Sequence, residues 1–181
     1  MITASRILAG MLQVTPILPA AVPPPVRSAQ CWSGPEVLVV AREVSRRAGS
    51  HSWAGLMSPA GASEPDDLLT LLIYCYLAGV FHSAEVARRL QLDPALTGLR
   101  EQLNVTTQEI RRFRRRQRRS LNDALTRALL RLSGAPEAAR EGTANGLMHS
   151  RLTFHRLEPF YLAAQDRIDR AIILDSQALD D

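Results

Sequence analysis

Residues 106–132 read TTQEIRRFRRRQRRSLNDALTRALLRL, and this stretch decides the fold of the chain. Thr106 and Glu109 form a capping box, in which each side chain can satisfy an unpaired backbone N–H at the start of a helix. The helix is therefore predicted to begin near Thr107. A Ser-Gly pair ending at Gly134 is a typical helix stop. We therefore predict one long amphipathic helix over this stretch.

The apolar or neutral positions of this stretch recur at steps of three and four, which places them on one face of a helix of about seven turns. They are Ile110, Phe113, Gln117, Leu121, Leu125, Ala128 and Leu132. Helices in water derive most of their stability from burying such a face against neighbours. The stretch therefore predicts an all-α fold, namely a small helical bundle.

The other face of the first three turns consists of arginines. They are Arg111, Arg112, Arg114, Arg115, Arg116, Arg118 and Arg119. Like charges three and four positions apart destabilise a helix by about 0.2–0.5 kcal/mol per pair, and almost no acid is interleaved here. A solvated face is the alternative interpretation, but solvated faces usually mix signs. Unmixed arginines favour the phosphates of a nucleic acid as the counter-charge.

Three shorter helices are predicted before the basic helix. An apolar helix begins after Pro65 and stops at Gly79, a second begins at Ser83, and a third extends from Asp93 to about Asn104. The Ser83 helix and the basic helix suggest a helix-turn-helix-like arrangement. About fifteen residues, with a helix of their own, lie between them, whereas the simple motif has a turn of three or four residues.

The two ends of the chain differ from this middle part. Residues 1–65 are rich in Pro, Gly and Ser and are predicted to form a flexible or loosely packed leader. One periodic patch within it, at 36–47, could form a short helix. Residues 66–132 form the predicted helical domain. Residues 133–181 contain a linker and an acidic C-terminal helix from Pro159 to about Ala178.

The C-terminal helix is expected to place Tyr161, Ala164, Ile168 and Ile172 on one face. Residues 158–181 contain six acids and two arginines. Such a tail could fold back on the basic helix or keep the protein soluble, and we favour solubility.

Other chemistry finds little support in the sequence. Cys31 and Cys75 lie far apart without neighbouring His, and the four histidines show no metal-ligand spacing, so we expect no metal and no cofactor. Residues 7–22 resemble the core of a signal peptide, but prolines interrupt them. The apolar run at 68–81 is too short to span a membrane. We expect a cytoplasmic protein.

The stretch from Asp67 to Leu132 resembles the transposase InsH N-terminal domain, found in bacterial insertion-sequence transposases. The resemblance rests on LLIYCYLAGVF at 71–81, Ser83, EVAR at 85–88, Thr107, Ile110 and RFRR at 112–115, in the family's order. The family's polar-Pro-His stretch is replaced by QLNV at 102–105.

This resemblance implies a helical domain that binds DNA at transposon ends, followed in full enzymes by an RNase H-like catalytic domain. Fewer than fifty residues follow Leu132, so we expect a non-catalytic protein, such as a truncated transposase. The expected DNA contacts are Thr107, Gln108, Arg111, Arg112, Arg114, Arg115, Arg116, Arg118 and Arg119, with the first three nearest the bases. The alternatives are an RNA-binding protein and a helical module that self-associates into a homo-oligomer through the apolar stripe.

Overall fold

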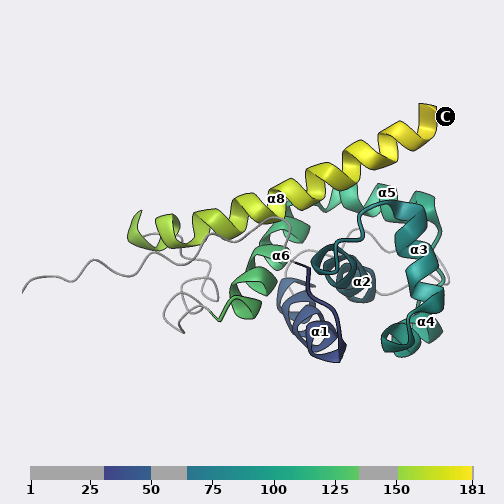
Figure 1. The fold of residues 1–181 in the computed structure, drawn as a ribbon, viewed down its shortest axis with the longest axis horizontal. Coiled ribbons are helices and arrows are strands. Elements are labelled where there is room, and N and C mark those ends of the chain that lie inside the picture. Colours follow the sequence, from purple (N-terminus) through teal and green to yellow (C-terminus); the bar gives the residue numbers. More distant parts are fainter. Residues whose placement is uncertain (1–30, 50–64, 135–150, 181) are drawn as a thin grey trace, which may run out of the picture.

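The computed structural model describes residues 31–49, 65–134 and 151–180, and these residues form helices without a strand (Figure 1). In chain order the elements are α1 (Pro35–Gly49), α2 (Pro65–Leu77), α3 (Ser83–Leu92), the 3-10 turn η1 (Pro94–Leu96), α4 (Thr97–Gln102), α5 (Thr107–Arg116), α6 (Arg118–Leu132) and α8 (Arg151–Asp180). The predicted all-α fold is confirmed.

Helix α2 is the centre of the bundle. Its residues 68–77 are all buried, because α1, α3, α4 and α6 pack around it. A helix that is apolar on every side requires such surroundings. The helix ends before Gly79, whose φ of +79° is a left-handed conformation that costs glycine little. The predicted core helix and its stop are therefore confirmed.

Helix α6 carries the second half of the predicted apolar stripe. Leu121, Leu125 and Ala128 are fully buried, and α6 packs against α1, α2 and α8. The prediction of one uninterrupted basic helix is wrong, however, because the helix breaks at Gln117, where φ is −109° and ψ is 25°. The break has a tertiary cause: α5 packs against α3 and α8, whereas α6 packs against α1 and α2 as well as α8.

Helix α1 changes the predicted domain boundary. Val37, Ala41 and Val44 recur at helical spacing and are buried against α2 and α6. The backbone N–H of Trp32 also donates to the carbonyl of Leu77, at 2.8 Å. The prediction of a loosely packed leader is therefore wrong for residues 35–49, which belong to the core. Residues 1–30 and 50–64 of the predicted leader lie outside the described residues.

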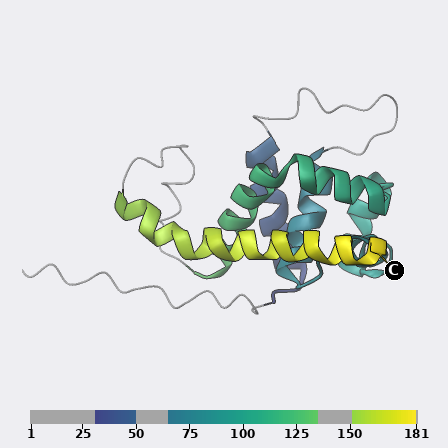
Figure 2. The ribbon, with the colours of Figure 1, turned by 90° about the horizontal axis from the view of Figure 1, so that it is seen from above.

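Helix α8 begins earlier than predicted, at Arg151, and contains Pro159. It lies along α6 and α5 and spans the length of the bundle (Figures 1 and 2). Its buried face includes Phe160, Ala164 and Ile168. Tyr161 was predicted to share a face with Ala164 and Ile168, and it lies at the edge of that face, where it is 38% exposed. The tail folds back onto the basic segment, which is the alternative that the sequence analysis did not favour.

Helix α3 begins at Ser83 as predicted, whereas the predicted third helix consists of η1 and α4. Asp93 accepts a hydrogen bond from the backbone N–H of Ala95 and so caps η1, which leads into α4. Helix α3 contacts both α4 and α5, and α4 lies between α3 and α5 in the sequence. Among the described helices, none has the length and apolar character required to cross a bilayer.

Candidate nucleic-acid interface

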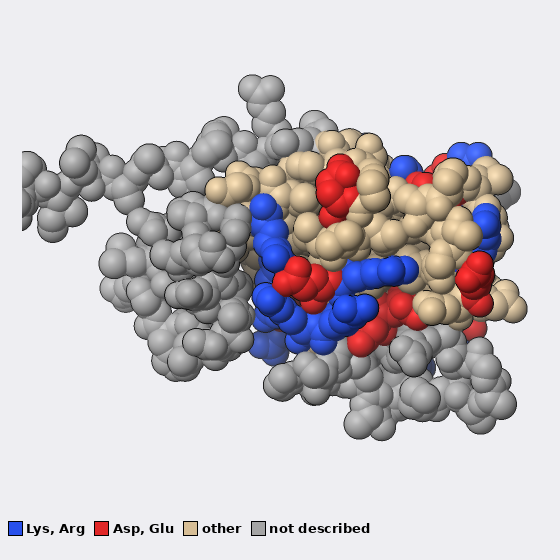
Figure 3. Space-filling view, turned by 90° about the horizontal axis from the view of Figure 1, so that it is seen from below, with Lys and Arg blue, Asp and Glu red and all other residues tan. Residues whose placement is uncertain are grey.

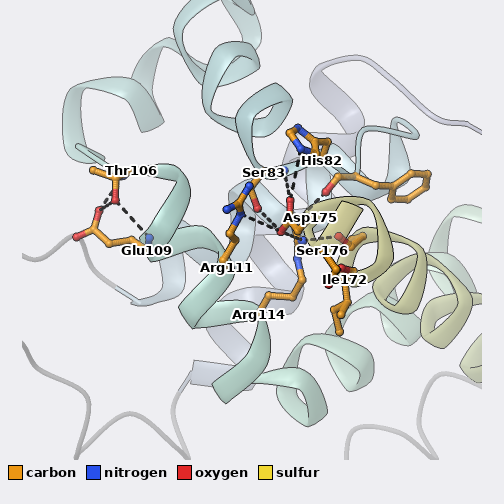
Figure 4. A network of polar contacts seen from close by, with 11 residues as sticks. His82, Ser83, Thr106, Glu109, Arg111, Arg114, Ile172, Asp175 and Ser176 are labelled. Carbon is orange, nitrogen blue, oxygen red and sulfur yellow. Dashed lines mark hydrogen bonds and ion pairs between the residues drawn. The ribbon is translucent and has the colours of Figure 1, made fainter. Parts of the chain in front are cut away.

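The start of α5 is fixed by its capping box. The side chain of Thr106 accepts a hydrogen bond from the backbone N–H of Glu109, at 3.3 Å, and Glu109 accepts one from the backbone N–H of Thr106, at 2.8 Å (Figure 4). Two backbone donors at the helix N-terminus are thereby satisfied. This predicted cap is confirmed, and it sets which residues of α5 face inward.

The inward face of α5 carries Ile110 and, one turn later, Arg114, which is only 1% exposed. The guanidinium of Arg114 donates to Asp175 Oδ2 at 2.5 Å, to the carbonyl of Ala171 at 2.9 Å and to the carbonyl of Phe81 at 2.9 Å. It also lies over the ring of Tyr76, 5.4 Å from the centroid. Arg114 is therefore a structural residue of the core.

Asp175 is the shared hydrogen-bond acceptor of this network (Figure 4). Its carboxylate accepts from the backbone N–H of Ser83 at 2.9 Å and from the Ser83 hydroxyl at 2.6 Å. Arg111 Nε lies 3.7 Å from it, and His82 Nε2 lies 3.9 Å from it. One buried carboxylate of α8 thus joins α5 to the start of α3, and it compensates the charge of Arg114.

The predicted contact set therefore needs correction. Arg114 cannot reach a phosphate because it is buried, so its assignment to DNA is wrong. Its position four residues after Ile110 is the sequence signal that could have shown this. Arg118 is exposed but forms an ion pair with Asp169 of α8, and Arg111 is largely turned toward Asp175.

Four of the predicted arginines are exposed and lack an ion-pair partner among the described residues. They are Arg112, Arg115, Arg116 and Arg119. The first three line a recess of about 390 Å³ together with Gln108 and Arg111. We call this the α5 recess. No acidic residue lines it, so its field is positive.

The other two predicted contacts lie at the beginning of α5. Thr107 is its first residue and is half-buried, whereas Gln108 is exposed. The structure thus brings Gln108 together with the arginines of the recess and leaves Thr107 outside its lining.

A second group of arginines was missed by the sequence analysis. Arg46 and Arg47 of α1 are exposed, and α1 packs against α6, where Arg131 pairs with Glu43. Glu43 also pairs with Arg47, at 2.8 Å. Figure 3 shows basic side chains gathered around acidic ones on the face where α1 and α4 lie. Because positively and negatively charged side chains are mixed on that face, the α5 recess is the stronger candidate for binding a polyanion.

Comparison of the chain with protein-family models, with curated proteins and with solved structures gave no match. The described residues contain no group of three His, Cys, Asp or Glu side chains that could hold a metal ion. The geometry of the arginines is therefore the observation from which a function can be argued.

Proposed function

We propose that this chain is a non-catalytic DNA-binding protein whose α5 recess contacts the phosphate backbone. We further propose that it is related to the N-terminal DNA-binding domain of insertion-sequence transposases, on the blocks of sequence quoted above. The observation that carries the proposal is the α5 recess, in which four arginines meet without a carboxylate in the lining.

The fold supports this function by orienting α5. Arg112, Arg115 and Arg116 are three and four positions apart and share one face of the helix. Arg114 is held on the opposite side by Asp175. The exposed guanidinium groups are thereby presented together, and each phosphate that they neutralise would release condensed counterions.

The roles within the recess follow from position. Arg112, Arg115 and Arg116 would bind phosphates, since guanidinium groups match phosphate oxygens in pairs. Thr107, Gln108 and Arg111 stand at the N-terminal half of α5, and Gln108 is the exposed residue best placed to reach a base edge.

The alternative of self-association through the apolar stripe loses support. Leu121, Leu125 and Ala128 are fully buried within the chain itself, so the stripe has no free face for a second copy. RNA binding uses the same guanidinium chemistry and is separated by the test below.

The test removes the charge of the recess. Replacing Arg112, Arg115 and Arg116 together by Ala should lower the slope of log affinity against log salt by up to about 2.7 on duplex DNA, because each phosphate contact contributes about 0.9. The control removes the same charge elsewhere, at Arg88, Arg100 and Arg170. Fluorescence anisotropy over a series of salt concentrations measures both.

The two outcomes are distinct. A reduced slope in the recess variant alone supports the proposal, and an unchanged slope removes it. Competition by duplex RNA at matched salt decides between the nucleic acids, since an RNA that displaces DNA at lower concentration would overturn the assignment to DNA.

A further inference from the structure

A second recess lies where α6 meets α8. It measures about 250 Å³ and shares no residue with the α5 recess. Its lining consists of Arg118, Arg119, Asn122, Tyr161, Gln165 and Ile168. We call it the α6–α8 recess. The composition combines cations, side-chain amides and an aromatic ring in one small concave site.

Asn122 is a buried polar residue in the lining of this recess. The residue is only 6% exposed, and its Oδ1 has no hydrogen-bond partner among the described residues. An unsatisfied buried polar atom costs about 1–3 kcal/mol, so a partner at this position would be favourable. A ligand with a donor group that enters the recess could satisfy this amide.

Tyr161 supplies a flat surface at the same recess. It is 38% exposed on α8, while its neighbour Phe160 is buried. Exposed aromatic rings bind unstacked bases, because every base has a face that can stack. Beside it, Gln165 adds a second side-chain amide, and such amides can donate to and accept from a base edge.

Arg119 brings a positive charge to this site. It is exposed, and no described residue forms an ion pair with it. It follows Arg115 and Arg116 by four and three residues, on the other side of the break at Gln117, so the two arginine groups are close in the sequence. A strand whose phosphates lie on α5 could therefore extend to this recess.

We propose that the α6–α8 recess binds one unpaired nucleotide. The base stacks on Tyr161, the amides of Asn122 and Gln165 meet its hydrogen-bonding edge, and Arg119 binds its phosphate. This inference rests on the proposed function, since it specifies the form of nucleic acid that the arginine surface prefers. A free nucleotide offers the same chemistry, and the experiment separates the two sources.

The experiment compares a fully paired DNA duplex with the same duplex carrying one bulged 2-aminopurine nucleotide. The wild-type protein should bind the bulged duplex more tightly by at least about fivefold, which is the lower end of the effect of stacking one base on an aromatic ring. Stacking on Tyr161 should also quench the 2-aminopurine fluorescence. Free deoxynucleoside monophosphate is then added as a competitor.

The decisive variant is Tyr161→Ala, because the residue is exposed and its loss leaves the core intact. It should abolish the preference and the quenching while affinity for the paired duplex stays the same. Tyr161→Phe should keep both effects. The matched control is Leu162→Ala, which removes a 55% exposed side chain next to Tyr161 and outside the recess lining.

Equal affinity of the wild-type protein for the two duplexes overturns the inference, as does an identical response of Tyr161→Ala and Leu162→Ala. Loss of the preference on adding the free monophosphate supports the recess with a free nucleotide as an additional ligand; a preference that persists supports a nucleotide within a strand. Failure of the proposed function is read separately, from an unchanged salt slope of the α5 recess variant on the paired duplex.

Discussion

The guanidinium of Arg114 lies 2.5 Å from the carboxylate of Asp175, although 61 positions separate the two residues in the chain. Both side chains are almost completely buried. A buried ion pair is tolerated when further hydrogen bonds satisfy its remaining atoms. Here Ser83 donates to the carboxylate, and the carbonyls of Phe81 and Ala171 accept from the guanidinium, whose Nε alone has no partner among the described residues. The pair therefore connects α5, α8 and the segment before α3.

Replacing Asp175 by Ala should lower the free energy of unfolding by about 3–5 kcal/mol, because it leaves the charge of Arg114 buried without a partner. Urea denaturation measures the loss. The matched control is Ser176→Ala, since Ser176 is the exposed neighbour and its hydroxyl donates to the carbonyl of Ile172 in its own helix. Equal stability of the two variants would show that the ion pair contributes little.

The capping box of α5 gives a second, smaller prediction. Thr106→Ala should destabilise the protein by about 1 kcal/mol, because the backbone N–H of Glu109 loses its acceptor. Thr106→Ser keeps the hydroxyl and should stay close to the wild type. Thermal denaturation of the three proteins checks this order. Identical midpoints for the Ala and Ser variants would contradict a capping role for the hydroxyl.

Local signals explain how much of the fold was predictable. The Thr106 cap, the stop at Gly79 and the start at Asp93 depend on residues a few positions apart, and the structure confirms each of them. The break at Gln117 depends on which helices α5 and α6 contact. Such tertiary packing overrides helix periodicity and could not be read from the stretch itself.

The residue types of the candidate site were predictable from the sequence, but the partners of its side chains were not. The sequence identified the arginines of α5, yet the burial of Arg114 depends on a carboxylate in a distant helix. The α6–α8 recess similarly combines Asn122 and Tyr161 from two helices that are distant in the sequence. Contacts between remote segments have no short-range signature, so they required the structure.

The hydrogen bonds of Asp93 lead us to expect that the stability of the protein depends on pH. Burial alone would raise the pKa of its carboxyl, but hydrogen bonds from Ala95 N–H, Tyr74 and Arg89 outweigh it and hold the pKa below the ordinary value of 3.8. A group whose pKa is lower in the folded state stabilises the protein above its unfolded pKa, and this contribution is lost as the pH falls through the folded pKa.

Asp93→Asn isolates this contribution, because Asn still caps a helix but carries no charge. The variant should be less stable than the wild type near neutral pH, and the difference should shrink as the pH falls below about 4. Urea denaturation over a pH series measures it. Comparing the two proteins at each pH cancels the titration of the other carboxyls. A difference that does not change with pH would contradict the argument.

The two cysteines differ in burial, so the rates at which a thiol reagent labels them test whether the helices around α2 enclose it. Burial raises the pKa of the Cys75 thiol in α2 to about 12, so almost no thiolate is present at neutral pH, whereas Cys31 is exposed. A thiol reagent should therefore modify one cysteine in the folded protein and both in urea, and Cys31→Ser should leave the folded protein unreactive. Slow labelling of Cys75 requires the helices around α2 to open, so Asp175→Ala should accelerate it by shifting that equilibrium. If Cys75 instead reacts as fast as Cys31 in the wild-type protein, α2 is not enclosed by its neighbours.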